Sequence, residues 1–129
     1  MAGGSPRSMT RAEIDALLRE ATIAHLAMVD GVWPYVVPIN FGYDRDCLYF
    51  KALRIGRKVA VLRANPRVSF VVGEGLASFV EARTEKARAL DSLLGKFCKG
   101  PFKYSPKLLD DALIVRVRIE SLSGRRVGK

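Results

Sequence analysis

Apolar residues in the first part of the chain follow the spacing of a helix and then that of strands. Thr10 followed by Glu13 has the sequence of a capping box, which marks a helix start. Behind it the apolar positions lie three or four residues apart, at Ile14, Leu17, Leu18 and Ala21. This spacing predicts a helix over residues 11–21 with one buried face.

From residue 23 the chain changes to runs rich in β-branched and aromatic residues. Two turn signals, Asp30-Gly31 and residues 44–46, separate these runs. The pattern predicts three antiparallel strands, near residues 23–29, 32–42 and 46–52, with a tight hairpin at Asp30-Gly31. His25 shares a strand face with three apolar residues, which predicts that its side chain packs inside the sheet.

The second half of the chain also mixes helices with strands. A helix over residues 56–64 is predicted to stop at Asn65-Pro66, because the residue before a proline disfavours the helical conformation. The other predicted elements are a strand over 67–72, a turn at 73–75, a strand over 76–82, a helix capped by Thr84, a loop over 99–107 and a strand over 113–119. The helix after Thr84 has an apolar stripe formed by Ala87, Leu90, Leu93, Leu94 and Phe97.

Short antiparallel strands with helices between and after them predict a mainly β protein, a small barrel with peripheral helices. A chain of 129 residues suits one domain, which we expect over residues 10–129. The chain begins with MAGGSPRS, which is small, polar and aperiodic. We therefore expect residues 1–9 to be a disordered leader.

The composition excludes several classes of function. No apolar run approaches the ~18 residues of a membrane span. Cys47 and Cys98 form no CxxC pair, which indicates reduced thiols and a cytoplasmic protein. A single histidine cannot build a His-based metal cluster, and GxGxxG, GxxxxGK[ST] and nucleophile-elbow motifs are missing from the sequence.

The formal net charge is +9, which favours polyanions, phosphorylated small molecules or acidic membranes as partners. The charge is concentrated in the middle of the chain. Between residues 45 and 67 one acid, Asp46, stands against seven cations, namely Arg45, Lys51, Arg54, Arg57, Lys58, Arg63 and Arg67.

Two of these cations, Arg57 and Lys58, fall in the first turn of the helix predicted over 56–64. The N-terminus of a helix already carries about half a positive charge, so cations there are disfavoured unless an anion lies among them. A phosphate at this terminus would meet free N–H groups and charge-assisted hydrogen bonds, and Gly56 would let it approach the backbone. The cluster therefore favours a site for a phosphate monoester.

Two other interpretations of the cluster stay open. The first is a solvated basic surface without a ligand. The second is a small basic nucleic-acid-binding barrel, whose strand aromatics would stack on bases. The candidate aromatics are Phe41, Tyr43, Tyr49 and Phe50.

The order of motifs adds a resemblance. An N-terminal helix precedes HLAMVDGVWPYVVPINFGY and then LYFKALRIGRKVAVLRANPRVSFVV. This order resembles the pyridoxamine 5′-phosphate oxidase-like FMN-binding split-barrel family, and most of all its nitroimidazole-resistance branch. That branch typically has a Pro-Tyr-x-x-Pro-x-x-Phe strand, a Tyr-Phe-His strand end, a Gly-Arg-Lys turn and an Asn-Pro-Arg-Val strand start. The resemblance covers residues 11–72, and more weakly 75–95.

The resemblance implies a six-stranded antiparallel split β-barrel that forms a homodimer, with FMN in a groove at the subunit interface. It also implies a flavin-dependent oxidoreductase that acts on a small molecule. One strand of such proteins runs beside the isoalloxazine ring with its backbone, and it corresponds here to Val37, Pro38, Ile39 and Asn40. The residues that correspond to the phosphate site are Tyr49, Phe50, Lys51, Ala52, Arg57 and Lys58.

The chain departs from this branch at two places. Lys51 stands where the branch usually has a histidine, so reduction of a nitro group does not follow from the resemblance. The connection near residues 72–76 is shorter than is usual in the family. A shortened hairpin could uncover the flavin groove, which leaves as an alternative a relative that has lost FMN and binds another phosphorylated ligand, a deazaflavin or haem.

Overall fold

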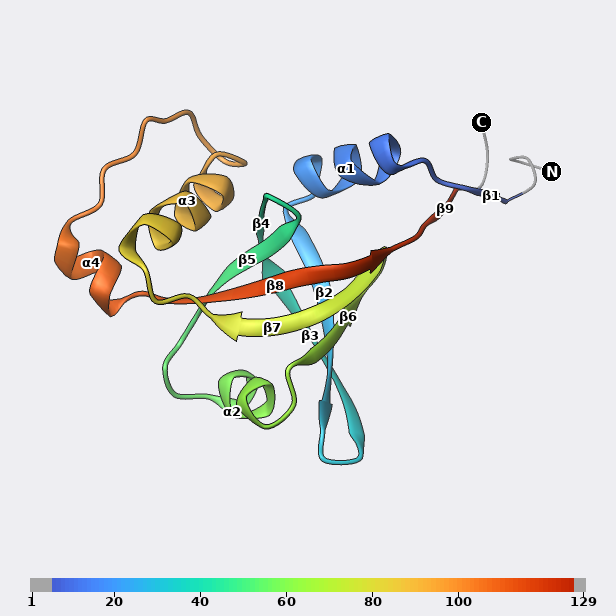
Figure 1. The fold of residues 1–129 in the computed structure, drawn as a ribbon, viewed down its shortest axis with the longest axis horizontal. Coiled ribbons are helices and arrows are strands. Elements are labelled where there is room, and N and C mark those ends of the chain that lie inside the picture. Colours follow the sequence, from blue (N-terminus) through green and yellow to red (C-terminus); the bar gives the residue numbers. More distant parts are fainter. Residues whose placement is uncertain (1–5, 127–129) are drawn as a thin grey trace.

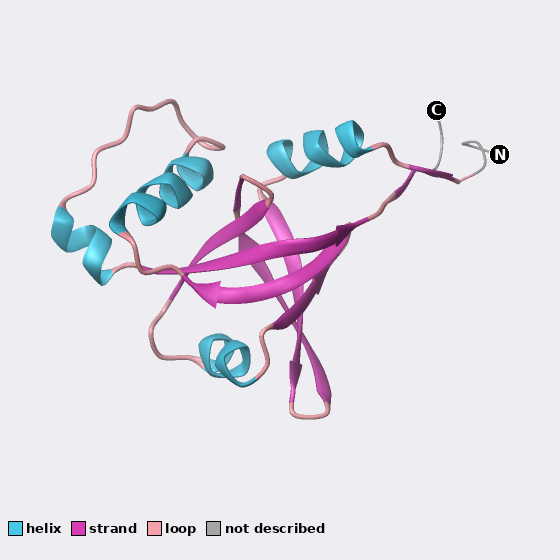
Figure 2. Ribbon diagram, in the orientation of Figure 1, coloured by secondary structure: helices cyan, strands magenta, loops and turns pink. Residues whose placement is uncertain are grey.

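The structure, a computed structural model, describes residues 6–126. A curled antiparallel sheet forms its centre, and the helices lie around the outside (Figures 1 and 2). The elements in chain order are β1 (Arg7–Ser8), α1 (Arg11–Glu20), β2 (Ile23–Asp30), β3 (Trp33–Asn40), β4 (Gly42–Asp44), β5 (Cys47–Ala52), α2 (Arg57–Ala64), β6 (Arg67–Phe70), β7 (Gly73–Phe79), α3 (Arg83–Leu94), α4 (Pro106–Asp111), β8 (Leu113–Leu122) and β9 (Arg125–Arg126).

The main sheet has seven strands in the order β3-β2-β6-β7-β8-β5-β4, and every pairing is antiparallel. Its two edge strands, β3 and β4, do not pair with each other, but β3 contacts β5 as the sheet curls round. This open seam makes the architecture a split barrel with peripheral helices, as the sequence predicted. The sheet has seven strands where the resemblance implied six, because the strand predicted over 32–42 divides in two. Among the described residues every helix is too short or too polar to cross a membrane.

The elements of the first half form where they were predicted. Thr10 Oγ1 accepts a hydrogen bond from Glu13 N at 3.1 Å, and Glu13 Oε1 accepts one from Thr10 N at 2.9 Å, which completes the capping box of α1. Gly31, at φ 64°, turns the tight hairpin between β2 and β3. The strand predicted over 32–42 divides in two, because β3 ends at Asn40 and β4 begins at Gly42.

The turn predicted at residues 73–75 lies instead at Val71 and Val72, and the glycines belong to β7. These glycines mark a close approach to β8 rather than a turn. A Cβ atom on Gly73 would lie 2.7 Å from the carbonyl oxygen of Ser121, closer than real Cβ contacts come. Glycine inside a strand often has this role, which the sequence pattern does not distinguish from a turn.

The helix α3 begins at Arg83, so Thr84 lies inside it and does not cap it. Its buried residues are Lys86, Ala89 and Leu90, and Leu90 alone of these belongs to the predicted stripe. Lys86 is buried because its Nζ donates to the carbonyl oxygens of Leu109 at 2.8 Å and Ala112 at 2.9 Å. The tertiary contact therefore rotates the buried face away from the most apolar side of the helix.

A short helix, α4, begins within the loop predicted over 99–107. Ser105 caps it by accepting a hydrogen bond from Leu108 N at 3.1 Å, and Pro106 occupies its first turn. Serine followed by proline is a known helix-start signal, so the sequence contained the information. The cluster of prolines and glycine nearby suggested a loop more strongly.

Part of the predicted leader has regular structure. Arg7 and Ser8 form β1, which pairs with Arg125 and Arg126 of β9. Glu13 accepts hydrogen bonds from Arg7 Nη2 and Arg126 Nη1, both at 2.8 Å, and so ties the two ends to α1. The prediction for residues 1–5 falls outside the described residues.

The sheet has a hydrophobic core on each side of β5 and β8. The larger core fills the curl of the sheet and includes Leu26, Phe41, Leu48, Phe50, Val115 and Val117. The smaller core lies between the outer face of these strands and the helices α3 and α4, and includes Tyr49, Ala89, Leu90, Leu109 and Ile114. Because β5 is covered on both faces, neighbouring residues along it are buried in different cores.

Gly42 is where α3 meets the edge strand β4. A Cβ atom there would collide with Ser92 Oγ and would lie 2.6 Å from Leu93 N. We therefore expect Gly42→Ala to lower the free energy of unfolding by roughly 1–3 kcal/mol, because a backbone atom of α3 would have to move. Urea denaturation measures this change.

Gly31→Asn is the matched control. No atom lies within 4 Å of a Cβ placed on Gly31, and asparagine tolerates positive φ better than most residues. A loss of stability for Gly31→Asn equal to that for Gly42→Ala would contradict the close packing of α3 on β4.

Candidate functional site

Arg57 is held in one position at the start of α2. Its Nε donates a hydrogen bond to Asp30 Oδ2 at 2.9 Å, and its guanidinium lies 4.0 Å from the ring centroid of Tyr35. Asp30 and Tyr35 belong to the β2–β3 hairpin, so the cation is fixed across two elements that are far apart in the sequence. Contacts with the β2–β3 hairpin therefore fix the position of this member of the cation cluster.

No side chain caps the N-terminus of α2, where Arg57 lies. The N-cap residue is Gly56, and no side chain accepts a hydrogen bond from the first turn of α2. The first turn also contains no acidic residue. Its N–H groups and partial positive charge, together with Arg57 and Lys58, form an electropositive site on the surface.

The predicted site residues on β5 divide into buried and accessible ones. Tyr49 and Phe50 are 3% and 1% exposed, so their side chains belong to the two cores. Lys51 is exposed and Ala52 is half-buried. Lys58 is half-buried, with its Nζ 5.4 Å from the ring centroid of Phe50. A surface ligand can therefore meet Lys51 and Lys58, but not the rings of Tyr49 and Phe50.

Tyr49 takes part in a polar network under α3. Its hydroxyl donates to Glu85 Oε2 at 2.8 Å, and Arg116 Nη1 donates to both carboxylate oxygens of Glu85 at 2.6 Å. Burial and the bond to Glu85 raise the pKa of Tyr49. Partial burial opposes ionisation of Glu85, but the bonds from Arg116 and Tyr49 outweigh it and lower the pKa of this carboxyl. The network joins β5, α3 and β8, and the residue patterns did not reveal it.

The strand β3 offers backbone groups at the open seam. Phe41 N donates to Thr22 O, which continues the β2–β3 register. The backbone groups of every second residue counted back from Phe41, including Ile39 and Val37, therefore point toward β2. By the alternation of an antiparallel pair, Val36, Pro38 and Asn40 direct theirs toward the seam. Proline is tolerated at such an edge position because it has no N–H to pair. Of the four predicted residues of β3, Pro38 and Asn40 therefore present backbone groups to a ligand, whereas Val37 and Ile39 pair with β2.

The outer face of the β2–β3 hairpin is apolar and exposed. Ile23 and Val36 are 56% and 60% exposed, and Pro34 and Pro38 lie on the same face. His25 also lies on this face and is exposed, so the prediction that it packs inside the sheet is wrong. The opposite face of β2, with Leu26 and Met28, fills the core. Alternation was read correctly, but the buried face was the other one.

The aromatics proposed to stack on nucleic-acid bases are not accessible. Phe41, Tyr43, Tyr49 and Phe50 are all buried. The hypothesis of a nucleic-acid-binding barrel loses the stacking surface on which it depended.

The comparisons with known proteins agree with this architecture. The family model for pyridoxamine 5′-phosphate oxidase matches residues 10–126. A candidate 5-nitroimidazole antibiotic resistance protein from Bacteroides thetaiotaomicron superposes with a TM-score of 0.84 at 23% identity, covering 98% of this chain and 91% of the other. An FAD-binding protein from Mesorhizobium loti has a TM-score of 0.74 at 26% identity, covering 93% of this chain and 96% of the other.

A sequence relative is an uncharacterized protein of Rhizobium meliloti, which is 32% identical over 68 residues. The match spans 53% of this chain and 44% of that protein.

The fold is a split barrel with an electropositive site beside its open seam. The chain belongs to the pyridoxamine 5′-phosphate oxidase family, as the order of its motifs indicated.

The polar network predicts a structural role for the Tyr49 hydroxyl. We expect Tyr49→Phe to lower the free energy of unfolding by about 1 kcal/mol, because Glu85 loses one donor but keeps Arg116. Tyr35→Phe is the control, since the Tyr35 hydroxyl forms no hydrogen bond with a described residue and the ring stays under Arg57. Equal urea midpoints for the two variants would show that the network does not stabilise the fold.

Proposed function

We propose that this protein binds FMN at a site shared by two copies of the chain. With this cofactor it acts as a flavin-dependent oxidoreductase on a small molecule. The observation that carries the proposal is the uncapped start of α2. Arg57 is fixed there beside Lys58, next to the open backbone edge of β3.

The phosphate of FMN suits the start of α2. A phosphate monoester carries nearly two negative charges at neutral pH and can accept hydrogen bonds from several directions. The N–H groups of the first turn and the two cations would supply them, and no carboxylate in that turn competes. Asp30 neutralises part of the charge of Arg57 but leaves its side chain 59% exposed.

The isoalloxazine ring suits the seam. Its pyrimidine edge carries both donors and acceptors, which the N–H groups of Val36 and Asn40 and the carbonyl oxygens of this edge would match. Its apolar dimethylbenzene edge suits the exposed apolar face of β2 and β3. FMN would supply the hydride-transfer chemistry, and the residues of the chain would bind and orient it. Lys51, exposed at the end of β5, would add positive charge near the ligand.

The same surface supports the proposed homodimer. The accessible predicted residues lie on the outside of the barrel, so one chain alone would cover one side of the ligand. The apolar outer face of the β2–β3 hairpin gives a second copy a surface to bury.

The cysteines Cys47 and Cys98 are free thiols, which supports the expected cytoplasmic location.

The family and its neighbours support the choice of cofactor class. The Mesorhizobium loti neighbour is an FAD-binding protein, and the family model is that of pyridoxamine 5′-phosphate oxidase. FMN rather than FAD is proposed because the start of α2 can bind a single terminal phosphate.

Titration with FMN tests the cofactor site. We expect the protein to bind FMN with a shifted flavin absorbance spectrum, and Arg57→Gln and Lys58→Gln to weaken binding by about tenfold each, because each removes a charge-assisted hydrogen bond. Arg63→Gln is the control, since Arg63 lies in the last turn of the same helix and packs on Phe79. A protein that ignores FMN but is stabilised by a deazaflavin, haem or another phosphorylated ligand would replace FMN by that ligand.

The oligomeric state tests the shared site. We expect wild-type protein to sediment as a dimer, and Val36→Asp to produce a folded monomer that has lost FMN binding, because a carboxylate cannot be buried unpaired in an apolar interface. Leu108→Asp is the control, since Leu108 is exposed on α4. A monomeric wild-type protein that binds FMN fully would remove the shared site from the proposal.

A further inference from the structure

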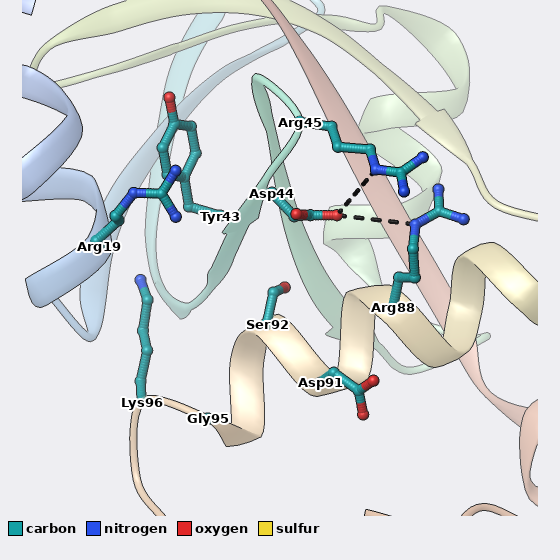
Figure 3. Close-up of a pocket in the computed structure, with 9 residues that line it drawn as sticks. All are labelled: Arg19, Tyr43, Asp44, Arg45, Arg88, Asp91, Ser92, Gly95 and Lys96. Carbon is teal, nitrogen blue, oxygen red and sulfur yellow. Dashed lines mark ion pairs between the residues drawn. The ribbon is translucent and has the colours of Figure 1, made fainter. Parts of the chain in front are cut away.

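A second electropositive cavity lies on the other side of the curled sheet from α2. It is open to solvent and is bordered by the C-terminal end of α1, the β4–β5 turn and the C-terminal half of α3, with a volume of about 500 Å³ (Figure 3). Four cations from these elements surround it, namely Arg19, Arg45, Arg88 and Lys96. None of the residues predicted to bind FMN lines this cavity.

Two carboxylates, Asp44 and Asp91, line the cavity with the four cations, so its positive charge is only partly compensated. Asp91 accepts a hydrogen bond from the Tyr104 hydroxyl at 2.8 Å. Asp44 Oδ2 lies 3.8 Å from both Arg45 Nε and Arg88 Nε, which is beyond hydrogen-bond distance.

Arg88 Nε is shielded from solvent and has no hydrogen-bond partner among the described residues. Arg19 forms no ion pair with any residue that the structure describes. Asp44 faces the buried Arg88 Nε, whereas the Arg45 and Arg88 side chains as a whole are 70% and 38% exposed. Neither guanidinium forms a hydrogen bond with a described residue, so both can donate to a ligand.

The walls of the cavity are held firmly. Lys96 donates to the carbonyl oxygens of Leu18 at 2.9 Å and Ala21 at 2.6 Å, which ties α3 to the end of α1. Arg45 has φ 50° in the β4–β5 turn, a conformation that few residues other than glycine adopt. The close approach of α3 to Gly42 fixes the third wall. These contacts position the elements that carry two pairs of cations, Arg45 with Arg88 and Arg19 with Lys96, on either side of Asp44 (Figure 3).

We propose that this cavity binds the phosphate group of a small hydroxyl-bearing phosphorylated metabolite. Two guanidinium groups, those of Arg45 and Arg88, offer donors from different directions to a tetrahedral anion. Asp44 lies between the arginine pair and the pair formed by Arg19 and Lys96 (Figure 3). A carboxylate at this position repels a bare anion but accepts hydrogen bonds from sugar hydroxyls, which favours a sugar phosphate over inorganic phosphate. This inference does not depend on the proposed flavin site.

Isothermal titration calorimetry at constant ionic strength tests the site, with the protein saturated in FMN where it binds FMN. The probes are ribose 5-phosphate, inorganic phosphate and ribose. We expect ribose 5-phosphate to bind, inorganic phosphate to bind more weakly, and ribose not to bind. Arg88→Gln and Arg45→Gln should each weaken ribose 5-phosphate binding by about tenfold.

Arg57→Gln separates this cavity from the start of α2 and should leave ribose 5-phosphate binding unchanged. Asp44→Asn should abolish the preference for ribose 5-phosphate over inorganic phosphate. Arg45→Gln is expected to fold like the wild type, because the Arg45 side chain is 70% exposed. The proposal is overturned if ribose 5-phosphate does not bind at millimolar concentration, if folded Arg45→Gln binds it as wild type does, or if Arg57→Gln alone abolishes binding.

Discussion

The burial of β5 and β8 on both faces is the constraint on which the rest of the structure depends. One face packs into the curl of the sheet through Phe50 and Val115, and the other packs under α3 and α4 through Tyr49 and Ile114. Burial of this apolar surface is the main favourable term that holds the helices to the barrel. It fixes α3 against β4, and it delivers the chain from β5 to the start of α2. The hydrophobic cores therefore position the elements that form both electropositive sites.

The two sites differ in how their charge is tolerated. At α2 the N-terminal cations oppose the helix dipole, and Arg57 is retained because Asp30 and Tyr35 hold it. Beside α3, Lys96 lies at the C-terminal end of α1, where a cation is favoured. Partial burial nonetheless lowers the pKa of Lys96 to about 8. Each arrangement leaves positive charge available to a ligand at a defined position.

Local patterns predicted most elements but misassigned the buried faces of α3 and β2. The capping box, the Asp30-Gly31 hairpin and the α2 boundaries depend on neighbouring residues, so the sequence was enough. The buried face of α3 depends on Lys86, whose partners lie on α4, and no helical periodicity indicates a lysine in a core. The face of β2 that includes His25 was predicted to be the buried one because both faces of β2 contain apolar residues. Alternation alone cannot show which of two apolar faces packs into the core.

The sequence by itself determined the mainly β class, the family, and the position of a cation cluster at a helix start, because these depend on local spacing and on an ordered set of motifs. The tertiary structure alone decided which site residues are accessible, since Tyr49 and Phe50 are removed by cores that form only when distant elements meet. It alone decided that Arg57 meets Asp30 and Tyr35, and that four cations from separate elements surround one cavity. Such contacts join residues far apart in the chain, and their geometry exists only once the sheet has curled.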